Sequence, residues 1–191
     1  MVCAHETGLV SRLELIRAAV AMTAPNAELM RHNPLSKIPT LILDDGTVLF
    51  DSPVICEYLD TLHSGPRMFP SAPAARFTAL RRQALGDGFL DVLLLWRNER
   101  DRPAQLVSRA HLDAYALKTQ TVLAALEAES SALRGAAFDI GPLTLGCALS
   151  YLDFRFPDYD WRSSYHGLAD WHAAILARPS MAATQPIDDG L

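Results

Sequence analysis

The chain has 191 residues, half of them hydrophobic and 20% charged, and it can bury a core as one domain or as two small ones. A formal net charge of -5 at pH 7 argues against a nucleic-acid partner, because neutralising phosphates requires a clustered basic face. No stretch has the pattern of a signal peptide or the length of a membrane span, so we expect a cytoplasmic protein without a membrane partner.

The three cysteines, Cys3, Cys56 and Cys147, form neither a CxxC motif nor a spacing typical of metal sites. An odd number without such spacing favours reduced thiols over a disulfide framework. We therefore expect no bound metal, and we interpret Cys3 and Cys147 as packing residues. The lack of a CxxC motif also argues against a disulfide-exchanging enzyme of the thioredoxin type.

The first third of the chain mixes short apolar runs with turn residues. This pattern predicts a helix that ends at Gly8, a strand over residues 13–16, a helix within residues 19–31 and a loop over residues 32–36. Two further strands are expected at residues 40–43 and 48–50. Between them lies Asp45-Gly46, a dipeptide favoured in two-residue hairpin turns, so we expect these two strands to pair antiparallel.

A helix is expected to follow the hairpin. Ser52 can cap its start, and Pro53 suits the first helical position. One apolar stripe then recurs at helical spacing, formed by Val54, Ile55, Tyr58, Leu59 and Leu62. The sequence Ser-Gly-Pro at residues 64–66 should end this helix.

The segment SGPRMFPSAP, residues 64–73, predicts a linker, because it contains three prolines and one glycine. We expect a first domain over residues 1–65 and a second over residues 66–191. The second part has helical spacing throughout, with long helices over residues 75–100 and 103–133. Asp139 can cap a third helix, and a last one should stop at Arg178-Pro179.

The segment SKIPTLILDDGTVLFDSPVICEYLD resembles the glutathione site of glutathione transferases. In that family an Ile-Pro pair, a strand, a hairpin, an acidic-Ser pair and an Ile-x-x-Tyr-Leu helix follow in this order. The stretches AHETGL, HNPLSKIP, LGCALSYLDFRFPDYDWR and HAAILARPSM extend the resemblance to bacterial members over nearly the whole chain. The resemblance implies a two-domain α+β fold, with a thioredoxin-like glutathione-binding domain followed by an all-α domain.

The resemblance also implies how glutathione would be bound. It implies that the Ile38-Pro39 bond is cis and that the main chain of Ile38 meets the cysteinyl part of the tripeptide. The γ-glutamyl end would bind at Asp51 and Ser52, and the glycine carboxylate would meet Lys37. Residue types alone favour an ordinary trans loop proline at Pro39, because few X-Pro bonds in folded proteins are cis. They also allow Ser52 to be a simple helix cap, Asp51 a surface charge and Lys37 a solvated lysine.

In such proteins the helical domain supplies the pocket for a second, electrophilic substrate. Leu93, Trp96 and Arg97 could contribute to it, although aromatic residues at helical spacing are more often found in a core or a dimer interface. The resemblance implies conjugation of the glutathione thiol to a hydrophobic electrophile, which is a detoxification reaction. It also implies a homodimer and glutathione as co-substrate. The alternative is a catalytically impaired glutathione-binding or protein-interaction module of the same fold.

One departure from the family concerns its catalytic residue. Family members open with a strand and a loop that carries a catalytic Ser, Tyr or Cys, whereas this sequence begins inside the helix that follows. Neither Cys3 nor Ser11 lies where the family places that residue, so no catalytic residue is assigned. Three explanations of this departure remain open. They are a start codon placed too late, a truncated variant, and a gap filled by rearrangement or by a neighbouring subunit. We expect residues 13–16 not to pair with residues 40–43 in the family's register.

Overall fold

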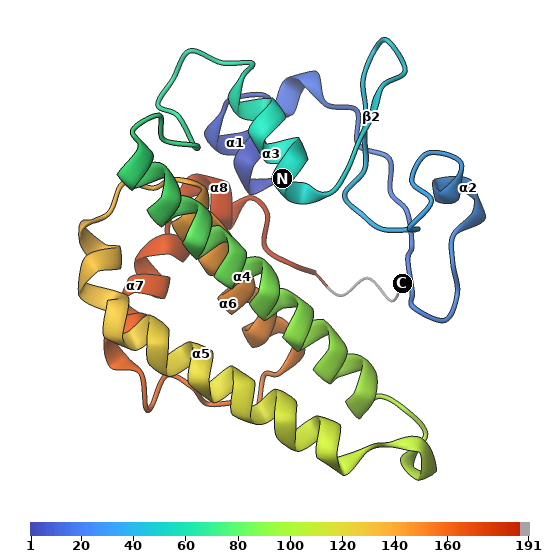
Figure 1. The fold of residues 1–191 in the computed structure, drawn as a ribbon, viewed down its shortest axis with the longest axis vertical. Coiled ribbons are helices and arrows are strands. Elements are labelled where there is room, and N and C mark those ends of the chain that lie inside the picture. The colour runs from blue at the N-terminus through green and yellow to red at the C-terminus, as the bar shows by residue number, and fades with distance from the viewer. Residues whose placement is uncertain (188–191) are drawn as a thin grey trace. The chain divides into compact units, whose positions relative to one another are not determined.

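The computed structural model describes residues 1–187, which divide into two compact units, Met1–Phe69 and Pro70–Pro186 (Figure 1). The division lies inside the proline-rich segment 64–73, four residues beyond the boundary expected at residue 65. The end of the first unit is held by the buried carboxylate of Asp60, which accepts hydrogen bonds from the amides of Met68 at 2.7 Å and Phe69 at 3.0 Å.

The first unit combines short helices with one hairpin. Its elements are α1 (Val2–Glu6), a 3-10 turn (Val10–Arg12), α2 (Ala27–Met30), β1 (Leu41–Ile42), β2 (Val48–Leu49) and α3 (Ser52–Asp60). Helix α1 packs against α3, and buried side chains such as Val2, Ile55 and Leu59 fill the space between them. This packing fixes the position of α3, which carries the predicted residue Ser52.

Strands β1 and β2 pair antiparallel, as predicted, with Leu41 opposite Leu49 and Ile42 opposite Val48. The turn differs from the predicted two-residue form. The amide of Gly46 donates to the carbonyl of Leu43, and Gly46 itself has a positive φ of 85°. This is a three-residue loop in which a β-turn is followed by a left-handed residue, and glycine suits that position because it has no Cβ. The Asp45 carboxylate stabilises the loop by accepting from the amide of Thr47 at 2.8 Å.

Two elements predicted for the first unit differ in the structure. Residues 13–16 form no strand, and Leu15 and Ile16 are 66% and 81% exposed. As expected, they do not pair with residues 40–43, and the sheet of the described residues contains only β1 and β2. The helix expected within residues 19–31 is reduced to α2, because Pro25 cannot continue a hydrogen-bonded helix and Asn26 starts a new one as its cap.

The second unit is entirely helical, as predicted. Its elements are α4 (Pro73–Arg100), a 3-10 turn (Ala104–Leu106), α5 (Arg109–Gly135), α6 (Ile140–Arg155), α7 (His166–Leu176) and α8 (Pro179–Ala182). Helix α5 begins later than expected, because Ser108 caps it by accepting from the amide of His111. Asp139 caps α6 as predicted, accepting from the amide of Gly141 at 2.9 Å.

Helix α6 forms the centre of this unit and packs against α4 and α7. Most residues from Ile140 to Leu152 are buried, which is the pattern of a helix enclosed on all sides. Glycines allow the close approach of the neighbouring helices. A Cβ on Gly86 of α4 would lie 2.8 Å from Cγ2 of Thr144 and 3.0 Å from its main-chain carbon. Within residues 1–187, no helix is both long and apolar enough to cross a membrane.

Candidate functional site

The register of the hairpin brings two predicted site residues to the same end of the first unit. Leu41 pairs with Leu49 across the two strands. Leu41 and Leu49 are the outermost pair of the hairpin. Ile38 and Pro39 lie three and two positions before Leu41, and Asp51 and Ser52 lie two and three positions after Leu49, so both predicted segments leave the hairpin at its open end.

Helix α3 starts at this open end. Its cap position is occupied by Asp51 rather than by Ser52 as expected, and Ser52 is the first helical residue. No side chain caps the first turn, so its N–H groups are available to a ligand. These groups lie at the positive end of the helix dipole and favour a negatively charged group. Ser52 is half-buried, whereas Asp51 is exposed.

The loop before β1 is organised by Asn33, which is 1% exposed. Its side-chain amide donates to the carbonyl of Lys37 and to Oγ1 of Thr40, both at 3.0 Å, and its oxygen accepts from the amide of Leu35. The peptide bond that follows Ile38 is cis, and so is the bond between Phe50 and Asp51. Asn33 therefore determines the course of the main chain that leads to Ile38.

Sequence reasoning missed Asn33 as part of this site. The pair Asn33-Pro34 indicates a turn, and it does not reveal that the amide faces inward. The predicted residues of the loop are on the surface instead: Lys37 and Pro39 are exposed, and the side chain of Ile38 is 55% exposed. The side chain of Ile38 therefore lies outside the core of the first unit.

The residues expected to line an electrophile pocket lie on α4 of the second unit and differ in exposure. Leu93 is fully buried in the core. Trp96 is half-buried and contacts the rings of Phe156 and Tyr159, with centroids 4.7 Å and 5.7 Å away. Arg97 donates to the side chain of Asn98 at 3.0 Å. Of the three, Trp96 and Arg97 reach the surface.

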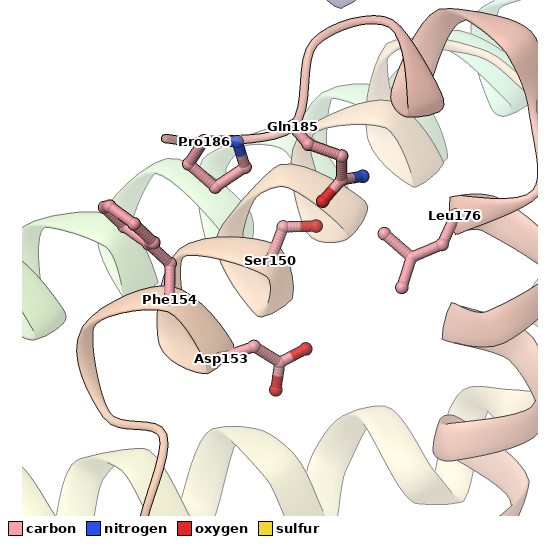
Figure 2. Close-up of a pocket in the computed structure, with 6 residues that line it drawn as sticks. All are labelled: Ser150, Asp153, Phe154, Leu176, Gln185 and Pro186. Carbon is pink, nitrogen blue, oxygen red and sulfur yellow. The ribbon is translucent and has the colours of Figure 1, made fainter. Parts of the chain in front are cut away.

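A second group of polar residues in this unit has the composition of a serine hydrolase triad. Nε2 of His172 lies 3.3 Å from Oγ of Ser150, and Nδ1 lies 3.7 Å from Oδ2 of Asp153. Ser150 and Asp153 direct their oxygens toward a small pocket that is also lined by Phe154, Leu176, Gln185 and Pro186 (Figure 2). The hydrogen bonds decide whether this group could activate the serine.

The protons of this group are in the wrong places for catalysis. Arg162 donates to Nδ1 of His172, and a guanidinium can only donate, so the imidazole proton is on Nε2. That nitrogen cannot accept the proton of Ser150, whose hydroxyl donates to the carbonyl of Gly146 at 2.8 Å. The carboxylate of Asp153 is bound by Arg162 at 2.7 and 2.5 Å. The arrangement is a structural hydrogen-bond network, in which His172 and Ser150 are buried and Arg162 reaches the surface.

His172 is fully buried, and burial lowers the pKa of its imidazole to about 4. It is therefore neutral at pH 7, which agrees with its position as an acceptor for Arg162. Within residues 1–187, no cluster of three or more His, Cys, Asp or Glu side chains has an arrangement that could hold a metal ion.

Comparison with known proteins points to one family. Residues 1–62 match the family described as Glutathione S-transferase, N-terminal domain. The chain is 31% identical over 156 residues to the uncharacterized GST-like protein YibF of Escherichia coli K12, which covers 81% of this chain and 77% of that protein.

Solved structures agree with this similarity. A glutathione transferase family member from Pseudomonas fluorescens Pf-5, crystallised with bound glutathione, is 43% identical. It superimposes with a TM-score of 0.94 over 98% of this chain and 92% of that one. A glutathione S-transferase from Methylobacillus flagellatus with glutathione bound is 31% identical, with a TM-score of 0.85 over 97% and 92% of the two chains.

Proposed function

The chain belongs to the glutathione transferase family, and on this premise we propose that it binds glutathione at the open end of the hairpin. The observation that carries the proposal is the open end of the hairpin at the pair Leu41 and Leu49, with Ile38 three positions before it and the uncapped start of α3 at Ser52 three positions after it. Relatives with this fold have been crystallised with glutathione bound, which supports the choice of ligand.

Each part of the tripeptide has a partner of suitable chemistry. The main chain of Ile38 offers an N–H and a carbonyl to the peptide groups around the cysteine. The γ-glutamyl carboxylate binds the hydroxyl of Ser52 and the amides of the first turn of α3, where the helix dipole favours an anion. Asp51 pairs with the adjacent ammonium group. Lys37, which is exposed, meets the glycine carboxylate, and Pro39 maintains the course of the main chain.

The reaction proposed is attack of the glutathione thiolate on an electrophilic carbon of a hydrophobic small molecule, as in detoxification. Of the three residues expected on α4, Trp96 and Arg97 reach the surface and are proposed to contact such a molecule, whereas Leu93 is buried in the core. We further propose that the protein acts in the cytoplasm as a homodimer and that glutathione is its co-substrate, without a metal.

A second candidate is a module that binds glutathione without turnover. The groups proposed above all bind the ends and the main chain of the tripeptide, and they leave no described residue assigned to its thiol. A free thiol has a pKa near 8.5, and lowering this pKa by two units requires the thiolate to be stabilised by about 2.7 kcal/mol. One hydrogen bond to the thiolate can supply most of that free energy. Without such a donor, binding would persist and conjugation would be slow.

Two measurements on the same protein separate these candidates. Retention on immobilised glutathione, with elution by free glutathione, tests binding. Conjugation of an activated aryl chloride, followed by absorbance, tests turnover. Retention with turnover supports the enzyme, and retention without turnover supports the binding module. A protein that is folded by circular dichroism but is not retained would overturn the proposed site.

A further inference from the structure

Two cysteines lie next to each other in the first unit although they are 53 positions apart in the sequence. Cys3 is on α1 and Cys56 is on α3, and these two helices pack together (Figure 1). Sγ of Cys3 lies 3.9 Å from the carbonyl oxygen of Cys56 and donates a hydrogen bond to it. The thiol of Cys3 therefore faces the turn of α3 that carries Cys56.

The two thiols differ in their exposure to solvent. Cys3 is 3% exposed, whereas Cys56 is half-buried. The hydrogen bond with Cys56 and the burial of the side chain both raise the pKa of Cys3, so this thiol is protonated at neutral pH. The thiolate is the nucleophilic form of cysteine, and an oxidant must also reach the sulfur. Because Cys3 is held in the protonated form and is enclosed, we expect the more accessible Cys56 to react first.

We propose that Cys3 and Cys56 form an intrachain disulfide when the protein meets glutathione disulfide, and that this bond ties α1 to α3. In the first step the Cys56 thiolate attacks one sulfur of glutathione disulfide, which forms a mixed disulfide and releases one glutathione thiolate. In the second step Cys3 gives its proton to solvent, and its sulfur attacks Sγ of Cys56. The second glutathione thiolate leaves and is protonated by water.

The electrons balance in this sequence. Two cysteine thiols are oxidised, and one glutathione disulfide is reduced to two glutathione molecules. The second step is the slow one, because little of Cys3 is ionised at neutral pH. The third cysteine, Cys147, lies on α6 of the second unit and takes no part.

The bond would restrain the part of the chain that carries the proposed glutathione site. The closed loop contains Asn33, the hairpin and Ser52, and a disulfide across a loop of this length limits the freedom of the unfolded chain. The oxidised protein should consequently unfold at a higher denaturant concentration than the reduced protein. Its α3, where the ligand would bind, is held by a covalent link in addition to packing.

The test uses the full chain, incubated with glutathione disulfide, quenched with a thiol-blocking reagent and analysed by mass spectrometry without reduction. We expect one blocked thiol instead of three, a loss of two hydrogens, and a peptide pair joined through Cys3 and Cys56. The Cys147→Ser variant should form the same bond. The Cys56→Ser variant, changed at the half-buried partner so that it still folds, should not form it and should show no oxidant-dependent rise in its unfolding midpoint.

Three results would overturn the proposal. One is a wild-type protein that keeps three reactive thiols under oxidation. The others are a Cys56 that stays as the glutathione mixed disulfide and a Cys56 that links two chains to each other. These readouts concern the covalent state alone, so they are independent of retention on immobilised glutathione. Failure of the disulfide and failure of the proposed binding function are thereby distinguishable.

Discussion

Leu41 and Leu49 form the outermost pair of the hairpin, and the chain leaves the sheet from this pair toward Ile38 on one side and Ser52 on the other. Ile38 offers a main chain, and Ser52 is the first residue of a helix whose first turn has no side-chain cap. Both groups lie within three positions of the same pair of residues in a sheet of two strands. The proposed site thus depends on the hairpin more than on any single side chain.

We expect Ser52→Ala to weaken glutathione binding about 10-fold or more, because a hydrogen bond to a charged group contributes about 1.5–3 kcal/mol. Asp51→Asn should weaken binding as well, through loss of attraction to the ammonium group. Isothermal titration with glutathione measures both effects. Asp44→Asn is the matched control, since it removes the same charge from an exposed residue in the turn of the same hairpin. Equal affinities for the Asp51 and Asp44 variants would remove Asp51 from the site.

We expect Asn33→Ala to lower both the stability of the protein and its affinity for glutathione. The change leaves the amide of Leu35 without its partner, removes one of the two donors to the carbonyl of Lys37, and costs about 1–3 kcal/mol. Urea unfolding and titration with glutathione give the two quantities. Leu35→Ala, in the same loop at a side chain 61% exposed, should change neither. An unaltered affinity in the Asn33 variant would show that this loop does not shape the site.

Two glycines of α4 provide a test of the packing in the second unit. Gly86→Ala should cost about 1–3 kcal/mol, because its Cβ would come within 3.0 Å of the main chain of α6. Gly88→Ala should be neutral or should stabilise the helix by up to about 1 kcal/mol, because no atom lies within 4 Å of its Cβ. The midpoints of urea unfolding measure both changes. Similar midpoints for the two variants would contradict the close approach of α4 and α6.

His172 should make stability depend on pH. Its pKa is lowered to about 4 in the folded protein and is near 6.5 when unfolded, so the unfolded chain binds the extra proton between these values. The contribution of His172 to the free energy of unfolding is consequently fully present above pH 6.5. It is lost as the pH falls toward 4, by about 3 kcal/mol in total. Unfolding free energies measured from pH 4 to 7.5 check this slope.

His172→Gln should flatten the slope between pH 4 and 6.5, whatever its effect on stability at pH 7. His166→Gln provides the control, because that side chain is exposed at the start of α7. A slope that is the same in the wild type and in the His172 variant would assign the acid sensitivity to other groups.

Features that arise from local chemistry were predictable from the sequence. Asp45-Gly46 predicts the hairpin, Ser52-Pro53 predicts the start of α3, and Asp139 predicts the cap of α6. Each acts on residues only a few positions away. Even there the details depended on neighbours, since the carboxylate of Asp45 binds Thr47 and favours a three-residue loop. The helices of the second unit followed from apolar spacing in the same way.

The wrong predictions concern residues whose structure depends on distant partners. A strand needs a neighbouring strand, and the apolar pattern of residues 13–16 does not reveal whether one is present. Asn33 is a residue type that is usually exposed, and only its three hydrogen bonds explain its burial. The group around His172 has the residue types of a catalytic triad, Ser, His and Asp. Residue types alone do not reveal that its protons are placed in a way that prevents catalysis.

The enclosure of α6 also has a consequence for biosynthesis. On the ribosome α4 and α5 emerge first, and the mostly apolar α6 follows before α7 can pack against it. Until α7 arrives, the nascent chain exposes a surface that would attract chaperones or other nascent chains. We therefore expect a chain truncated after Ser164, which retains α6 and lacks α7, to accumulate in inclusion bodies, and the soluble fraction after lysis measures this directly.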